Sequence, residues 1–261
     1  MMIVGYIDTH AHLYDKSFQD DIQEVIDRAL ASGVNRVLMP NCDVHTLNEM
    51  LALEASNPAF FKSMLGLHPT YVKEDYKEQL DQLHAQLDEK SFCAIGEIGL
   101  DYYWDKTFIS EQKDAFEQQI KWAKSYELPI VIHTRNSIPD GIKIVKAQQD
   151  GKLEGVFHCF SGSLEEAKEI VELGFLLGIG GISTFKNGGL TEILKEIPLS
   201  ALVLETDAPY LAPTPFRGKR NESAYIPFIA QEVAKVKEIS VDEVAMTTTQ
   251  NAYELFKLNE I

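Results

Sequence analysis

Cysteine is scarce in this sequence of 261 residues. The three cysteines, Cys42, Cys93 and Cys159, are odd in number and form no C-x-x-C pair. They therefore predict neither a disulfide framework nor a thiolate metal site, and they suit a reducing compartment. We expect a cytoplasmic protein.

Long apolar runs and export signals are also missing. No basic segment precedes the apolar residues at 3–7, and no apolar run approaches the eighteen or so residues of a membrane span. We expect no export and no membrane association, and nothing in the sequence indicates a stable protein partner.

Positive charge is in short supply, with 24 Lys and Arg against 40 Asp and Glu and a formal net charge of −16. This balance argues against non-specific adhesion to nucleic acid, because counterion release needs a basic surface. Any nucleic-acid substrate would be held by a few local contacts. The hydrophobic share of 45% is that of an ordinary globular protein.

One pattern repeats along the chain, a short apolar run followed by a longer amphipathic segment. We predict strands at Ile3–Ile7, Arg36–Met39, Ser63–Leu67, Phe92–Ile95, Ile130–Ile132, Gly155–Phe157, Phe175–Gly178 and Leu202–Leu204. We predict helices at Phe18–Ser32, Val44–Ser56, Asp75–Glu89, Ser110–Tyr126, Asp140–Gln149, Leu164–Leu173, Leu190–Lys195 and from Ser240 to about Leu258.

This alternation predicts an α/β fold, a (β/α)8 TIM barrel. No internal repeat, low-complexity tract or linker divides the chain, so we expect a single domain over residues 1–261. A doubly wound open sheet is the alternative with the same pattern.

Polar side chains follow the predicted strands, whose carboxyl ends meet at one mouth in such a barrel. Five of the seven histidines do so, and only His45 and His84 fall within helical patterns. His10 and His12 are two residues apart in an extended segment, so their imidazoles point to the same side. The residues that we expect to bind metal are His10, His12, Glu97, His133, His158 and Asp207.

These six groups exceed what one tetrahedral ion with an open position takes, so we expect two divalent ions. We assign His10, His12, Glu97 and Asp207 to one ion, and Glu97, His133 and His158 to the other. The mixed donors suit zinc or manganese, while magnesium prefers more oxygen ligands. The ligand set does not choose among the three metals.

Six motifs resemble the TatD-type metal-dependent deoxyribonucleases of the amidohydrolase-like barrels. They are Asp-Thr-His-Ala-His-Leu at 8–13, Gly-Leu-His-Pro at 66–69, Ile-Gly-Glu-Ile-Gly-Leu-Asp-Tyr-Tyr at 95–103, His-Thr-Arg at 133–135, His-Cys-Phe-Ser-Gly at 158–162 and Glu-Thr-Asp-Ala-Pro-Tyr at 205–210. The resemblance implies the same six metal ligands and a 3′–5′ exonuclease acting on single-stranded DNA ends. In the family-like stretch 211–225, Thr214 and Ser223 depart from the pattern, but Arg217 and Asn221 stand in place.

The expected reaction is attack on a phosphodiester by a hydroxide bound between the two ions. Glu97 and Asp207 would act in catalysis as well as in metal binding, and His68 would protonate the leaving oxygen or bind phosphate. Arg135, Arg217 and Asn221 complete the expected substrate contacts. DNA ends are then a transient partner.

Two other readings fit the same residues. The same metals would serve hydrolysis of a lactone, an amide or the ester of an aminoacyl-tRNA, because the hydroxide would attack a carbonyl equally well. A non-catalytic metal-binding barrel is the third reading, and it predicts a broken ligand set, whereas all six predicted ligands are intact.

Overall fold

The computed structural model describes residues 5–258 and contains eight parallel strands in that range. The strands are β1 (Tyr6–Asp8), β2 (Val34–Pro40), β3 (Phe61–Met64), β4 (Ile95–Asp101), β5 (Ile130–Arg135), β6 (Gly155–Phe157), β7 (Leu176–Ile179) and β8 (Leu202–Leu204). Each lies at or beside an apolar run predicted as a strand. Ile3 and Val4, part of the first predicted run, lie outside the described residues.

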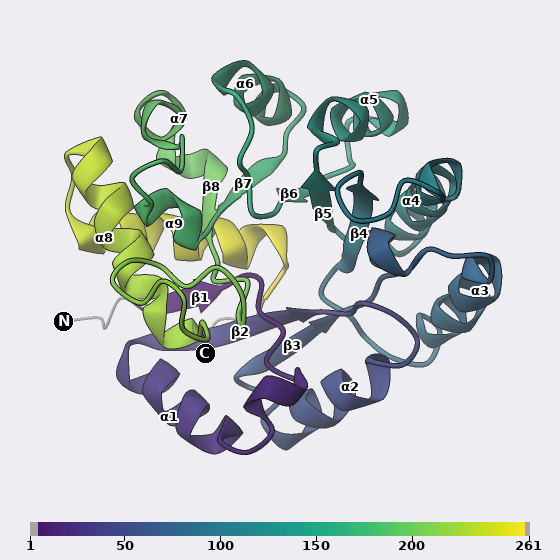
Figure 1. Cartoon of the computed structure of the whole chain (residues 1–261), viewed down its shortest axis with the longest axis horizontal. Coiled ribbons are helices and arrows are strands. Elements are labelled where there is room, and N and C mark those ends of the chain that lie inside the picture. The colour runs from purple at the N-terminus through teal and green to yellow at the C-terminus, as the bar shows by residue number, and fades with distance from the viewer. Residues whose placement is uncertain (1–4, 259–261) are drawn as a thin grey trace.

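The strands close into a barrel rather than an open sheet. They form a group ordered β1-β2-β3 and a group ordered β4-β5-β6-β7-β8. A bridge between Leu65, next to β3, and Ile95 joins β3 to β4, and one between Ala11 and Ala208 joins the segments that follow β1 and β8. Figure 1 shows the resulting ring of strands with helices around it. The predicted TIM barrel is confirmed.

Helices cover the outside of the ring. They are α1 (Ile22–Ala31), α2 (Leu47–Ser56), α3 (Tyr76–Gln86), α4 (Ile109–Tyr126), α5 (Ile138–Gln148), α6 (Leu164–Glu172), α7 (Thr191–Glu196), α8 (Ile226–Lys237) and α9 (Val241–Leu255). Helix α6 begins at a capping box between Ser163 and Glu166. None of the described helices is long and apolar enough to cross a membrane.

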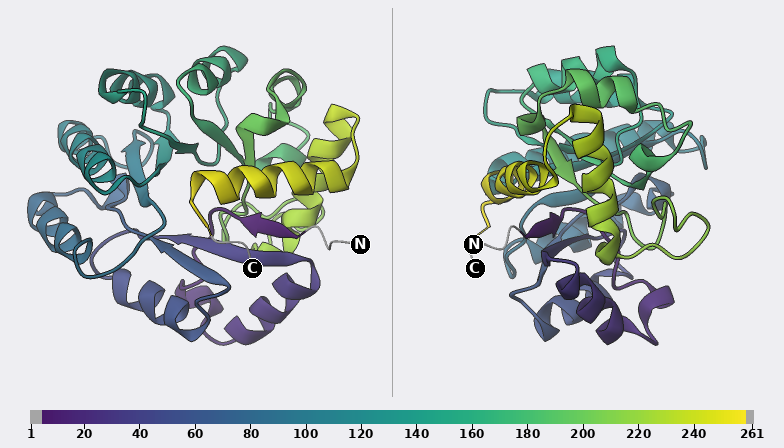
Figure 2. Two further views of the ribbon diagram at one scale, coloured as in Figure 1. Left: turned by 180° about the vertical axis from the view of Figure 1, so that it is seen from behind. Right: turned by 90° about the vertical axis from the view of Figure 1, so that its left-hand side faces the viewer.

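Helix α9 closes the amino-terminal end of the barrel. Seven strands, or the residues just before them, contribute one apolar side chain each to an inner layer of the barrel. Ile7, Leu38 and Val131 belong to this layer. Ala252, Leu255 and Phe256 at the end of α9 pack on that layer. Figure 2 shows α9 lying across the ring as seen from behind. Solvent and ligands therefore reach the barrel from the opposite end, where the strands finish.

Strand β4 differs from its prediction, because it begins at Ile95 where the predicted strand ended. Glycines at 96 and 99 lower the strand propensity of this segment, so its sequence resembles a loop. Between Ile95 and Ile98 the register slips by one residue against β5, from Ile130 to Ile132. Glu97 lies in this bulge, inside the strand and not after it.

Position 99 of the same strand requires a glycine. Its φ is 135°, and a Cβ there would lie 2.1 Å from the carbonyl oxygen of His133 on β5. Close approach of the two backbones therefore requires glycine. It brings β4 and β5 together where both carry polar side chains.

Candidate metal centre

Glu97 lies at the centre of the barrel mouth with histidines on both of its carboxylate oxygens. Its Oε2 is 3.1 Å from His10 Nε2 and 3.5 Å from His12 Nε2. Its Oε1 is 2.8 Å from both His133 Nδ1 and His158 Nε2. Each oxygen thus faces one of the two ligand pairs assigned from the sequence.

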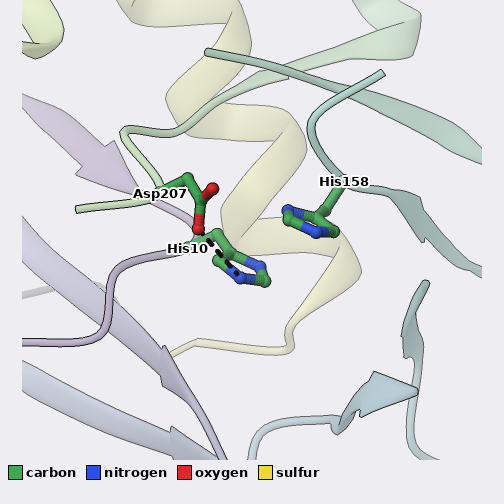
Figure 3. Close-up of side chains that lie close together, drawn as sticks. All are labelled: His10, His158 and Asp207. Atoms are coloured by element: carbon green, nitrogen blue, oxygen red, sulfur yellow. Dashed lines mark ion pairs between the residues drawn. The ribbon is translucent and has the colours of Figure 1, made fainter. Parts of the chain in front are cut away.

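Asp207 follows β8 and completes the side of His10 and His12. Its Oδ1 lies 3.8 Å from His10 Nε2 and 3.6 Å from His12 Nε2. Figure 3 shows Asp207 pointing toward His10, with the ring of His158 beside it. The rings of His10 and His158 stack with centroids 3.8 Å apart. The six predicted ligands come together, although their assignment to two ions stays a prediction.

Hydrogen bonds fix which nitrogen of His12 faces the centre. Tyr14 donates its hydroxyl proton to the carbonyl of Pro40 at 2.6 Å, so its oxygen accepts from His12 Nδ1 at 3.0 Å. The proton of neutral His12 then sits on Nδ1, and the lone pair of Nε2 points toward Glu97 and Asp207. That is the form in which imidazole binds a metal.

His133 is oriented in a similar way by Asp101, a residue that the sequence analysis did not predict. Its Nε2 lies 2.9 Å from Asp101 Oδ2, and its Nδ1 faces Glu97. Asp101 is buried at the end of β4, four residues after Glu97 on the same strand. Residues separated by an even number of positions point to the same side of a strand, so the position of Asp101 relative to Glu97 was a signal in the sequence. The prediction ended this strand at Ile95 and therefore did not use it.

His68 also reaches the centre, with Nε2 3.3 Å from Glu97 Oε1. The backbone N–H of Thr70 donates to His68 Nδ1 at 3.2 Å, and a backbone N–H can only donate. Neutral His68 therefore carries its proton on Nε2, pointing into the mouth. This tautomer supports the predicted role as a donor and not a role as a metal ligand.

The cluster of imidazoles controls the ionisation of the two central carboxylates. Burial alone would raise the pKa of Glu97, but His158, His68 and His10 hold it well below its usual value. Burial also opposes ionisation of Asp207, whose pKa is nevertheless lowered by His12, His158 and His10. Both groups are carboxylates at neutral pH, the state required of a metal ligand.

The donor set fits divalent metal ions. Three groups each bring imidazole nitrogens and carboxylate oxygens within 4.8 Å of one another: His10, His158 and Asp207; His10, His12 and Glu97; and His68, Glu97 and His133. Such a concentration of buried nitrogen and oxygen ligands is typical of a metal site and costly without one.

Further buried residues contact the predicted ligands from behind. Glu205 Oε1 accepts the backbone N–H of Cys159 at 2.5 Å and lies 3.5 Å from His158 Nδ1.

Asp8 accepts hydrogen bonds from the hydroxyl groups of Thr206 and Ser223, which tie β1 to the segment after β8. Burial, the largest cause, raises the pKa of Asp8 to about 7. Cys159 is partly buried, since β6 ends at Phe157 and Cys159 lies beyond the strand with a φ of 48°.

The predicted substrate residues differ in where they lie. The guanidinium of Arg135 stands at the mouth, 3.9 Å from the ring centroid of Tyr103. Arg217 lies 4.0 Å from the ring centroid of Phe185 and lines a separate hollow of about 830 Å³ with residues of α8. None of the six predicted ligands lines that hollow.

Asn221 corrects the prediction. It is fully buried, and its amide group donates to the carbonyl oxygens of Thr206 at 2.7 Å and Tyr210 at 2.6 Å. Both amide hydrogens are thus used inside the protein. Asn221 shapes the loop after β8 and does not contact substrate.

Fold and site together define a class, the metal-dependent hydrolases built on a TIM barrel. The family model for the TatD related DNase family matches residues 7–257, and the chain belongs to this family.

Among its relatives, the metal-dependent hydrolase YabD of Bacillus subtilis, named as uncharacterized, is 40% identical over 253 residues, covering 97% of this chain and 99% of the relative. The 3′-5′ ssDNA/RNA exonuclease TatD of Pectobacterium atrosepticum is 30% identical over 257 residues, covering 96% and 99%. The crystal structure of the TatD homologue YjjV from Escherichia coli superimposes with a TM-score of 0.93 at 30% identity, over 99% of this chain and 100% of that one.

Proposed function

We propose that the protein hydrolyses phosphodiester bonds in nucleic acid, as a 3′–5′ exonuclease on single-stranded DNA ends that uses two divalent ions of magnesium, manganese or zinc. The observation that carries the proposal is Glu97, each of whose oxygens faces a different pair of imidazoles. A carboxylate placed in this way suits two neighbouring ions. The name of the Pectobacterium relative supports the choice of substrate and polarity.

His10, His12, Glu97 and Asp207 would hold one ion, and Glu97, His133 and His158 the other. When bound, such ions lower the pKa of a water molecule and offset charge on phosphoryl oxygens. Asp207 would accept the proton of the attacking water. His68, with its proton on Nε2, would donate to the leaving oxygen.

Arg135 would bind a nonbridging phosphate oxygen from the rim, and Arg217 a phosphate further along the strand. The net charge of −16 makes such local contacts necessary, because the protein as a whole repels nucleic acid. This suits capture of a strand end better than a grip on long duplex. The single domain and the cytoplasmic location expected from the sequence stay predictions.

A 5′-labelled single-stranded oligonucleotide tests the proposal directly. With manganese or magnesium, 3′–5′ digestion yields a ladder of labelled products that shorten from the 3′ end, whereas 5′–3′ digestion releases a labelled mononucleotide at once. A blunt duplex should be cut more slowly, and chelator should stop the reaction. Intact oligonucleotide in every metal, alongside turnover of a lactone or an aminoacyl ester, would replace the nuclease with the carbonyl hydrolase.

A further inference from the structure

Exposed aromatic rings stand at the barrel mouth on the segments that follow the strands. Trp104, 68% exposed, is the most exposed large apolar side chain among residues 5–258, and Tyr103 beside it is 52% exposed. Both follow β4. The two rings adjoin, with centroids 4.9 Å apart, and contiguous exposed apolar surface of this kind marks ligand-binding sites.

Arg135 joins these rings in one cluster. Its guanidinium lies 3.9 Å from the centroid of Tyr103 and 5.2 Å from that of Trp104. Within the described part of the chain no carboxylate lies within 4.0 Å of it, although the protein is strongly acidic. A stacked guanidinium keeps its N–H donors at its edge, where they are available for an anion.

The cluster is tied to the metal centre through Asp101. One carboxylate oxygen accepts the backbone N–H groups of Tyr103 and Trp104, at 2.9 and 3.0 Å, while the other contacts His133. Arg135 lies two residues after His133 on β5. The aromatic rings are thus held beside a predicted metal ligand and are directed outward.

Tyr102 shows that the loop does not need these two rings as anchors. Its hydroxyl donates to Asp140 at 2.8 Å on α5, and its ring packs against the core. Loop anchoring is therefore the task of Tyr102 and Asp101. The rings of Tyr103 and Trp104 are left to serve another purpose.

We infer that Tyr103, Trp104 and Arg135 form a nucleobase-binding subsite, in which a base stacks on Trp104 and the edge of Arg135 binds its phosphate. Tyr103 stands edge-on to Trp104, with ring centroids 4.9 Å apart, and holds Arg135 on its own face. This inference rests on the proposed nuclease function and specifies how a strand end is recognised. Stacking of an unpaired base requires that the base be free of its complement, so the subsite selects single strands. It tolerates any base, since every base has a π face.

The two tryptophans of the chain allow a direct binding test. Trp122→Phe leaves Trp104 as the only tryptophan, and a phosphorothioate oligothymidylate resists cleavage during titration. We expect saturable quenching of Trp104 emission, and about tenfold weaker binding of the same oligomer with an abasic 3′-terminal nucleotide. Equal binding of the two oligomers, or constant emission while fluorescence anisotropy reports binding, would overturn the subsite.

Kinetics give a second test in the protein with its native Trp122. Trp104→Ala should raise KM for a single-stranded oligonucleotide about tenfold with little change in kcat, and Trp104→Phe should restore KM. Met246→Ala, at an exposed apolar residue on α9, is the matched control and should behave as the parent. An unchanged KM in Trp104→Ala, with cleavage intact, contradicts the subsite alone. Quenching without cleavage in any metal contradicts the nuclease function alone.

Discussion

His133 Nε2 lies 2.9 Å from Asp101 Oδ2, opposite the nitrogen that faces Glu97. A carboxylate in this position orients the ring and makes the other nitrogen a better ligand. Burial opposes ionisation of Asp101, but the bonds from His133, Trp104 and Tyr103 lower its pKa to about 2. Asp101 is therefore a charged positioning residue behind the centre.

Asp101→Asn should weaken metal binding without destroying the centre. The amide keeps the shape but loses the charge that holds His133, and loss of such a partner typically lowers metal affinity about 10- to 100-fold. The measurement is the metal concentration that gives half-maximal activity. Asp105→Asn is the control, since Asp105 follows in the same loop but pairs with Lys73 at 2.6 Å. Equal metal requirements in parent and Asp101→Asn would contradict the positioning role.

Glu97→Gln should abolish turnover while the barrel stays folded. The amide presents one neutral oxygen in place of a charge shared by His10, His12, His133 and His158, so we expect a loss of at least about a hundredfold in kcat. Circular dichroism checks the fold and elemental analysis the metal content. Activity that survives the change would show that Glu97 does not bridge.

Removal of His10 and His12 tests the division into two ions. The double alanine variant should lose about half of its bound metal, because His133, His158 and Glu97 remain for the second ion. Elemental analysis of the purified protein gives the ratio. Loss of all metal would mean one coupled cluster, in keeping with the 3.8 Å stacking of His10 on His158.

The sequence predicted the barrel and the convergence of the six expected ligands because both depend on local pattern. Apolar runs such as Ile130–Ile132 mark strands, and the residues that follow must converge when parallel strands close into a ring. Asp101 was missed because the glycines of β4 obscured the strand and a register slip falls at Glu97. Slips of this kind depend on the neighbouring strand.

Helix α8 is an omission of another kind. Ile226, Ile229, Ala230 and Val233 recur at helical spacing and are buried, and Pro227 suits a first turn. The signal was thus present in the sequence. Asn221 carried no such signal, since an asparagine that binds substrate and one that bonds two carbonyls look alike until the loop is folded.

Asn221→Ala should destabilise the protein. The change leaves the carbonyls of Thr206 and Tyr210 without their donors, which typically costs about 1–3 kcal/mol for buried groups. Chemical denaturation measures the free energy of unfolding. If Asn221 bound substrate instead, KM would rise at unchanged stability.

Tyr102→Phe should lower stability in a manner that depends on pH. Burial and then the bond to Asp140 raise the pKa of Tyr102 from 10.0 to about 12. The folded state therefore holds the phenol proton more tightly, so the stabilisation is complete below pH 10 and disappears as the pH rises through about 12. We expect a difference of about 1 kcal/mol between parent and variant below pH 10, shrinking across that window. A difference that stays constant to pH 12 would contradict this assignment.

Helix α9 sets the route by which molecules come and go. Because Leu255 and Phe256 seal the far end of the ring, a polymer cannot thread through the barrel. Whatever enters the mouth must leave by the same opening, past Tyr103 and Trp104. Under the proposed nuclease function, a shortened strand end would have to retreat or shift before the next bond is reached, so release of the cleaved piece and advance of the strand would compete for the same opening.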